Sequence, residues 1–148
     1  MILSDRDIKR CIKKGEISIE PFNPKNMTPN GYDLTINEIM VNGEVKKEAI
    51  VPPSTWFALG TIEYIKLRNK TAQLWIRSSY ARKGILSSFG KVDAGFEGTL
   101  TLSCFNTKEN VHLAHGDRFC QIVFEEISST PEKIYCGKYK GQKKITLG

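Results

Sequence analysis

Proline recurs through the first third of the chain and constrains its fold more than any other feature. These prolines are Pro21, Pro24, Pro29, Pro52 and Pro53. Because proline lacks the backbone N–H group that a helix interior needs, they exclude long helices from this region. Elsewhere, short apolar runs alternate with turn residues; the runs are 32–36, 62–67, 72–76, 100–105 and 119–124. Several short strands with frequent turns predict a mainly β fold, either a sandwich or a barrel.

The N-terminal segment is the exception and predicts one short helix. Ser4 can cap this helix, with Asp7 at the capping-box position and Gly15 as the stop signal. Ile8 and Cys11 give the segment an apolar stripe at helical spacing.

The length and the texture of the chain indicate its organisation. A chain of 148 residues has the length of one domain, and no internal repeat or linker divides it. We therefore expect a single domain over residues 1–148. Within it, the tail 131–148 is basic, polar and glycine-containing. Such a tail is either frayed or ordered by a ligand.

The net charge of +6 suits an anionic partner. The basic residues gather at the two ends of the chain, and no motif that reads a nucleic-acid groove or stacks on bases is present. No apolar run is long enough to cross a membrane. The first six residues lack the pattern of a signal peptide. We expect a cytoplasmic protein that binds a phosphorylated small molecule, without a nucleic-acid or membrane partner.

The four cysteines form no Cys-x-x-Cys pair, so we expect them to be reduced and partly buried. His112 and His115 are three residues apart and could meet a metal together with Cys120. The alternative, a loop that leads into a strand, is the better interpretation of this segment.

Four short segments do not resemble ordinary strands or turns. They are 30–34, 77–84, 92–98 and 116–121. In the second, Arg77 precedes two serines at a possible helix start, where a guanidinium and free N–H groups can bind phosphate. In the third, Asp93 follows a strand and can orient and deprotonate a water, and Phe96 can stack on a sugar or base. Each segment also has a simpler interpretation: a serine helix cap and an Asp-Gly type of turn.

Together and in this order, the four segments resemble the motifs of the trimeric dUTPase and dCTP deaminase superfamily. The opening 1–9, the segments 77–84 and 93–98, and the tail Lys138-Tyr139-Lys140-Gly141-Gln142 are most similar to the deaminase branch. The resemblance covers nearly the whole chain. It implies a distorted β-barrel or jelly-roll of the dUTPase-like β-clip type, a homotrimer with active sites between subunits, and dUTP or dCTP as the bound nucleotide.

The resemblance also implies roles for individual residues. Phosphate contacts are implied for Arg77, Ser78, Ser79, Lys138, Tyr139, Gln142 and, from a neighbouring subunit, Gln121. A hairpin at 85–91, which contains Ser87, Ser88 and Lys91, would read the pyrimidine largely through backbone groups, and Phe96 would pack against deoxyribose.

Catalysis is implied for Asp93, which would position the attacking water or hold the 3′-hydroxyl. Arg82 matches an arginine of the deaminase branch and joins this group. Asp33 would lie near Mg²⁺, the expected cofactor, through a water molecule.

One departure separates the two activities of the superfamily. In the deaminases, a glutamate that shuttles protons stands where this chain has Ser103. A serine hydroxyl cannot act as a general base near neutral pH. Glu97 is close in sequence, but nothing places it on the face of Ser103.

Hydrolysis of dUTP to dUMP and pyrophosphate needs a placed water, a nearby carboxylate, magnesium and cations on the developing charge. We therefore predict a dUTP diphosphatase. A dCTP deaminase, alone or bifunctional, is the first alternative, and a nucleotide-binding trimer without catalysis is the second. The sequence does not decide the base preference, because backbone groups read the base.

Overall fold

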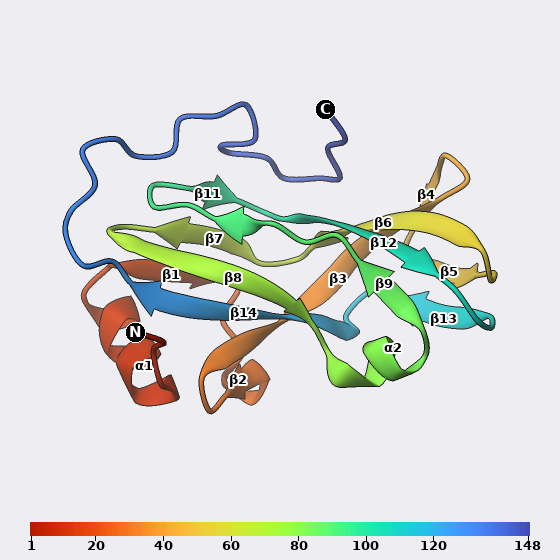
Figure 1. Ribbon diagram of the computed structural model, residues 1–148, viewed down its shortest axis with the longest axis horizontal. Helices are drawn as coiled ribbons and strands as arrows, with labels where there is room; N and C mark the ends of the chain where they lie inside the picture. Colours follow the sequence, from red (N-terminus) through yellow and green to blue (C-terminus); the bar gives the residue numbers. More distant parts are fainter.

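Ser4 begins the helix that the sequence predicts at the N-terminus. In the computed structural model, which describes all residues 1–148, this helix is α1, Asp5–Lys13 (Figure 1). The Ser4 side chain accepts a hydrogen bond from the Asp7 backbone N–H, and the Asp7 carboxylate accepts one from the Ser4 backbone N–H. Ile8 and Cys11 are buried, and Gly15 follows the helix with φ +71°. The capping box, the apolar stripe and the glycine stop are confirmed.

The rest of the chain is built from short strands. The first seven are β1 (Ile17–Glu20), β2 (Met27–Thr28), β3 (Gly31–Val41), β4 (Glu44–Lys46), β5 (Glu48–Val51), β6 (Thr55–Thr61) and β7 (Tyr64–Leu67). The last seven are β8 (Lys70–Ile76), β9 (Ile85–Ser87), β10 (Lys91–Val92), β11 (Glu97–Gly98), β12 (Thr101–Asn106), β13 (Val111–Ala114) and β14 (Arg118–Glu126). The remaining helical elements are η1 (Pro24–Asn26) and α2 (Ser78–Arg82). None of the helices is long and apolar enough to cross a bilayer.

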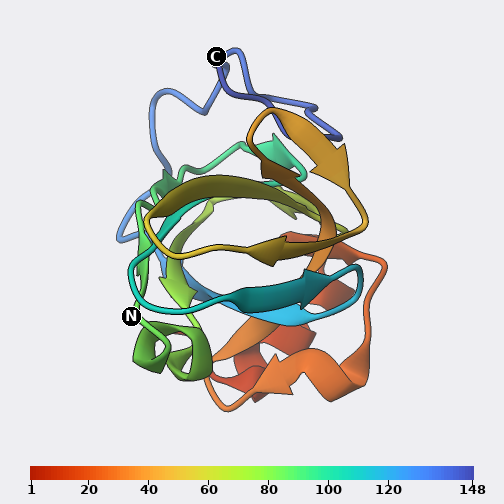
Figure 2. The same ribbon diagram turned by 90° about the vertical axis from the view of Figure 1, so that its right-hand side faces the viewer.

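All strand pairs are antiparallel. The largest sheet has nine strands, with the main order β10-β8-β14-β3-β6-β12-β9 and with β2 and β4 paired to β3. A three-stranded sheet, β1-β7-β11, and a pair, β13-β5, complete the structure. Viewed from the end, the sheets curl around a shared apolar interior (Figure 2). The fold is therefore a distorted half-barrel with one short N-terminal helix, as predicted.

The eleven residues of β3 join the two halves of the curled sheet. Its first part pairs with β14 and its second part with β6. Between Ile36 and Glu38 the register with β6 shifts by one residue, and such a bulge bends a strand and increases its twist. Phe57 and Phe119 meet edge to face in the interior beneath, with ring centroids 6.4 Å apart.

Strand β12 has one buried face and one outward face. Leu102 and Cys104 are buried, whereas Thr101, Ser103 and Phe105 point outward and are at least partly exposed. This is the alternation predicted for 100–105, because successive side chains of a strand point to opposite faces. The outward face of β12 forms part of the candidate site.

The arm, defined as residues 131–148, lies along the outside of the barrel above β11 (Figure 1). It contains no helix or strand, yet backbone hydrogen bonds hold it at several points. The Gly141 N–H donates to Glu97 O at 2.6 Å, the Thr99 N–H donates to Gln142 O at 2.8 Å, and the Thr146 N–H donates to Thr101 Oγ1 at 3.0 Å. These contacts fasten the arm to its own barrel.

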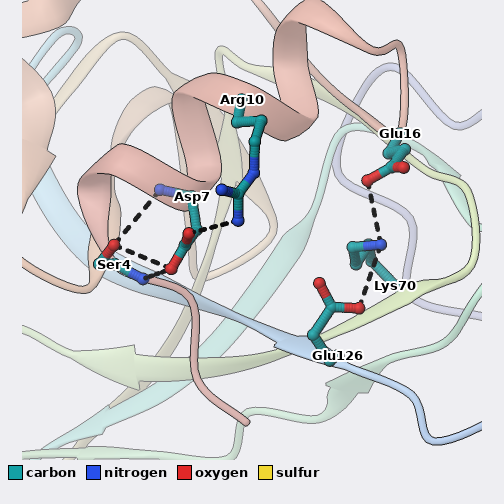
Figure 3. A network of polar contacts seen from close by, with 6 residues as sticks. All are labelled: Ser4, Asp7, Arg10, Glu16, Lys70 and Glu126. Atoms are coloured by element: carbon teal, nitrogen blue, oxygen red, sulfur yellow. Dashed lines mark hydrogen bonds and ion pairs between the residues drawn. The ribbon is translucent and has the colours of Figure 1, made fainter.

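Lys70 fastens the N-terminal segment to the large sheet (Figure 3). Its Nζ lies 3.1 Å from a Glu16 carboxylate oxygen and 3.3 Å from one of Glu126, and the lysine itself is only 4% exposed. Burial lowers the pKa of Lys70, but the hydrogen bonds with the two glutamates outweigh burial and raise it overall. The pKa of Glu16 is lowered, first by its hydrogen bond with Cys11 and then by that with Lys70.

Candidate active site

A cavity of about 370 Å³ opens between β10, β12 and the arm. Its lining combines a strand wall with arm residues: Leu74, Gly90, Lys91, Val92, Asp93, Phe96, Leu100, Thr101, Ser103, Tyr135, Tyr139, Gln142, Thr146 and Leu147. Five predicted site residues, Lys91, Asp93, Phe96, Tyr139 and Gln142, thus lie around one cavity, together with Ser103.

Asp93 stands in a tight turn directly after β10. The Phe96 N–H donates to Asp93 O at 3.1 Å, and Gly95 has φ +89°. A side chain at Gly95 would collide with the arm, since an added Cβ would lie 2.6 Å from Ile134. The turn interpretation of this segment is therefore correct, and the same turn presents the Asp93 carboxylate at the cavity. That carboxylate is exposed and makes no hydrogen bond or ion pair with the protein.

Phe96 forms an apolar wall of the cavity. Only 6% of the residue is exposed, and its ring lies 5.5 Å from the ring of Tyr135 in the arm. The backbone N–H of Tyr135 donates to Ala94 O at 2.7 Å, which fixes this part of the arm on the turn. A flat, rigid apolar surface beside a free carboxylate suits a sugar or a base.

Gln142 closes another side of the cavity. The Gln142 Nε2 atom donates to Thr99 O at 2.7 Å. The other amide atom, Oε1, therefore does not contact Thr99. Oε1 is buried without a hydrogen-bond partner. Because buried polar atoms are nearly always paired in folded proteins, this oxygen is suited to a donor on a bound molecule.

Ser103 also lines the cavity. Its hydroxyl accepts a hydrogen bond from Trp56 Nε1 at 2.8 Å. Glu97 pairs with Lys66 across β11 and β7 and does not line the cavity. Asp93 is therefore the only acid around the cavity.

A second polar cluster gathers on β3 and β14 and at the start of α2. Asp33 is 5% exposed, and its Oδ2 lies 3.2 Å from Arg77 Nε and 3.9 Å from an Arg118 nitrogen. Burial raises the pKa of Asp33, and the two arginines act in the opposite direction. Gln121 is the cross-strand partner of Asp33, and its Nε2 donates to Thr28 Oγ1 at 2.6 Å.

The predicted phosphate residues 77–79 lie at the start of α2, next to this cluster. Arg77 itself occupies the N-cap position and makes no side-chain cap bond, so the serine-cap interpretation is wrong. Ser78, Ser79 and Arg82 are exposed and make no side-chain hydrogen bond. Their side chains are free to meet a ligand.

The two groups of predicted residues do not meet within one chain. Val92, just before Asp93, pairs with Ala72 near the start of β8, whereas Arg77 follows the far end of that strand. Five residues of extended strand span roughly 17 Å. The cavity accordingly contains Lys91 but no arginine, so Asp93 does not share a cavity with Arg77 or Arg82 within one chain.

The remaining predicted residues lie near the cavity or at its edge. Ser87 lines a neighbouring hollow along β8 together with Lys91, and Ser88 is exposed and holds Ser103 through its backbone. Lys138 is exposed, with its Nζ 5.1 Å from the centre of the Tyr139 ring.

The zinc alternative is not supported. His112 pairs with Glu48, His115 Nδ1 contacts Asn37 O, and Cys120 is buried, where burial raises the pKa of its thiol. No group of three or more metal-ligating side chains occurs in the structure.

Sequence reasoning missed Trp56, Arg118, Tyr135 and Thr101 as parts of these two regions. Arg118 lies within the segment 116–121 that the motif comparison singles out, so a signal for it existed. Trp56 carries no such signal, because its contact with Ser103 spans 47 positions of the sequence.

Comparisons with known proteins identify related sequences and related folds. A family model described as dCTP deaminase-like matches residues 2–48 and 39–127. A probable deoxyuridine 5′-triphosphate nucleotidohydrolase from Sulfolobus islandicus rod-shaped virus 1 is 42% identical, over 99% of this chain and 98% of the relative. A dCTP deaminase from Pyrococcus horikoshii is 40% identical, over 99% and 96%. A dUMP-forming dCTP deaminase from Aquifex aeolicus is 39% identical, over 98% and 92%.

Solved structures share the fold at much lower identity. The dCTP deaminase of Agrobacterium tumefaciens superposes with a TM-score of 0.70 at 19% identity, over 83% of this chain and 47% of that one. The dUTPase of Staphylococcus bacteriophage 80alpha superposes with a TM-score of 0.56 at 17% identity, over 82% and 97%. With the family model and relatives near 40% identity covering almost the full length, the chain belongs to the dCTP deaminase-like family, within the superfamily that also contains the dUTPases.

Proposed function

We propose that this chain is an enzyme that hydrolyses dUTP to dUMP and pyrophosphate with Mg²⁺. The observation that carries the proposal is the acid content of the cavity. Asp93 is its only acid, and Ser103 occupies the wall where ring chemistry would need a second one. The viral relative at 42% identity, named a probable deoxyuridine 5′-triphosphate nucleotidohydrolase, supports the same activity.

Asp93 has the properties of a general base. Its carboxylate is exposed to the cavity and unpaired, so it can hold a water and accept its proton. The water oxygen then bonds to the α-phosphorus, the bond from that phosphorus to the bridging oxygen breaks, and pyrophosphate leaves. The Phe96 wall would pack on deoxyribose and leave no room for a 2′-hydroxyl.

The base would enter beside the 85–91 segment. In this proposal backbone groups of that segment, with Ser87, Ser88 and Lys91 at its surface, contact the pyrimidine. Tyr139 and Gln142 line the cavity from the arm and, with Lys138, close over the phosphates.

Phosphate binding requires a second copy of the chain. The cationic and hydrogen-bond donor groups for phosphate belong to Arg77, Ser78, Ser79, Arg82 and Gln121. In the same chain, however, roughly 17 Å of extended strand separates Arg77 from Asp93. We propose a homotrimer in which the arginine cluster of one copy faces the Asp93 cavity of another. Closed rotational symmetry repeats such a composite site at every interface.

Mg²⁺ fits the acids of this site through water and the nucleotide. The Asp33 Oδ1 atom makes no hydrogen bond, while Oδ2 already faces Arg77 and Arg118, so Asp33 suits a metal-bound water better than direct ligation. Mg²⁺ in such sites keeps several waters and takes most of its other ligands from substrate phosphates. When bound, it would neutralise charge on the triphosphate.

Deamination of dCTP is the second candidate, favoured by the relatives. The Pyrococcus and Aquifex proteins are named dCTP deaminases, the latter dUMP-forming. The arm sequence from Lys138 to Gln142 also belongs to the deaminase pattern. Against it stands the absence of an acid at Ser103.

The products formed from each nucleotide test the proposal. We expect the purified chain with Mg²⁺ to release pyrophosphate from dUTP, and to release no ammonia from dCTP. Pyrophosphate, uracil and cytosine nucleotides, and ammonia are measured separately. Ammonia from dCTP with dUTP left intact would establish the deaminase instead. Thermal stabilisation by dUTP without any product would establish a binding protein, since any ligand of the native state stabilises it.

A further inference from the structure

Ser103 is held in one orientation from two sides. Trp56 Nε1, on the neighbouring strand β6, donates to its hydroxyl at 2.8 Å. On the other side, the Ser88 backbone N–H donates to Ser103 O at 3.0 Å. Ser103 therefore lies against the 85–91 segment, at the end of the cavity where the proposed function puts the base.

The contact with Trp56 determines what the hydroxyl offers to the cavity. An indole N–H can only donate, whereas a serine hydroxyl has one proton and two lone pairs. Trp56 occupies one of the lone pairs, and the Ser103 proton has no acceptor in the protein. The hydroxyl thus keeps a free donor, on a wall that also carries Asp93 and Phe96.

We propose that the Trp56–Ser103 pair selects uracil over cytosine, an inference that rests on the proposed function. Uracil presents a carbonyl oxygen at C4, which accepts the Ser103 proton. Cytosine presents an amino group at C4, which can use only the remaining lone pair of the hydroxyl, so the serine proton would remain unpaired. Sites that pair with a substrate through hydrogen bonds discriminate strongly when a partner is left unpaired.

Trp56 acts here as a positioning residue, since it reaches the base only through Ser103. Its replacement by phenylalanine keeps an aromatic ring on β6 and removes only the donor. Ser103→Ala removes the hydroxyl, and Ser103→Thr retains it. Phe105→Leu is a matched control, because Phe105 shares the outward face of β12 and is the cross-strand partner of Trp56 but does not line the cavity.

The experiment measures the dissociation constants of non-hydrolysable imido analogues of dUTP and dCTP by calorimetry, with Mg²⁺. We expect the wild-type chain to prefer the uracil analogue. This preference should fall about tenfold in Trp56→Phe and Ser103→Ala and stay within about twofold in Ser103→Thr and Phe105→Leu. An unchanged preference in both Trp56→Phe and Ser103→Ala would overturn the inference.

Binding and turnover separate the two proposals. A wild-type chain that releases no pyrophosphate, but whose uracil preference is lost in the variants, would refute the proposed function and leave the base selection intact. A wild-type chain that hydrolyses dUTP, with variants that keep the preference, would refute the selection alone. If one of the two variants fails to fold, the other still tests the Trp56–Ser103 pair. Ser103→Thr shows whether a hydroxyl at position 103 is enough to keep the uracil preference.

Discussion

In the proposed enzyme, Asp93 and Ser103 have different roles in the cavity. Asp93 is an unpaired carboxylate, suited to a proton from water, and Ser103 is a neutral hydroxyl already engaged by Trp56. The exposure of Asp93 matters because its carboxylate is open to a water molecule, whereas the Asp33 carboxylate is buried and faces Arg77 and Arg118. The same residue type thus serves two purposes in two environments.

Asp93→Asn tests this division at the level of one residue. The amide cannot accept the proton of the attacking water, so we expect pyrophosphate release from dUTP to fall at least about a hundredfold. Thermal stabilisation by dUTP should persist, since the phosphate and base contacts remain. Asp5→Asn, in the half-exposed first turn of α1 and outside the cavity, serves as the control and should leave turnover unchanged. Normal turnover in Asp93→Asn would show that another group takes the proton.

Residues in continuous motifs could be predicted from the sequence, and residues joined by folding could not. Asp93 and Phe96 stand in one short segment, and both line the cavity. Trp56 is 47 positions from Ser103, and only the pairing of β6 with β12 brings their side chains together. The serine cap failed because the backbone places Arg77 at the N-cap, where its side chain turns to Asp33 instead.

At the level of elements, the arm was the least predictable part. Its composition is that of a mobile tail, but backbone bonds hold it to Glu97 in β11 and to Thr99 just before β12. Such backbone hydrogen bonds depend on the path of the chain rather than on the side chains. No pattern of residue types therefore predicts them. The helix α1 and the alternation of β12 were predictable, because helix capping and the burial of alternate residues depend on side chains close together in the sequence.

The position of the arm depends on the absence of a side chain at Gly98. It has φ +147°, and an added Cβ would lie 3.1 Å from the Gln142 N atom. We expect Gly98→Ala to displace the arm and to raise the KM for dUTP several-fold with a smaller effect on kcat. Hydrogen exchange of the arm amides should accelerate. Gly43→Ala is the control, since Gly43 also has a positive φ but open space around its Cβ position. Unchanged exchange in Gly98→Ala would mean that the contact does not hold the arm.

Lys70 and its two partners, Glu16 and Glu126, should contribute a pH-dependent part of the free energy of unfolding. Lys70→Met keeps the buried stem and removes the charge, and both partner glutamates are more than a third exposed. We therefore expect a loss of only about 1–2 kcal/mol in the free energy of unfolding at pH 7. Lys46→Met, which removes an exposed pair with Glu44, should have almost no effect.

The direction of the pH effect follows from the shifted pKa values. Glu16 has a lowered pKa in the folded state, so its contribution is present above the unfolded value near 4.5 and is lost as the pH falls through the lower folded value. Lys70 has a raised pKa, so its contribution is lost only as the pH rises above about 10.5. Urea unfolding of wild type and Lys70→Met should therefore converge in acid and at high alkaline pH. A difference that stayed constant well below pH 4.5 and well above pH 10.5 would contradict this.

For the whole molecule, the decisive property is that the site is divided. The Asp93 cavity and the Asp33–Arg77 cluster lie toward opposite ends of β8, and in the proposed trimer separate copies supply the two halves. The family resemblance implies active sites between subunits, but the distance between the two groups within one chain follows only from β8 being an extended strand.

Complementation between two inactive chains measures this claim most directly. Asp93→Asn and Arg77→Ala chains, with different affinity tags, are produced separately and together, and pyrophosphate release from dUTP is followed. Each chain alone should be inactive. In a random mixture about a quarter of the sites combine an intact Asp93 with an intact Arg77 from another copy, so about a quarter of the wild-type rate should return. Gln121→Ala can replace Arg77→Ala if that chain does not fold. A mixture that stays as inactive as its parts would contradict a site shared between copies.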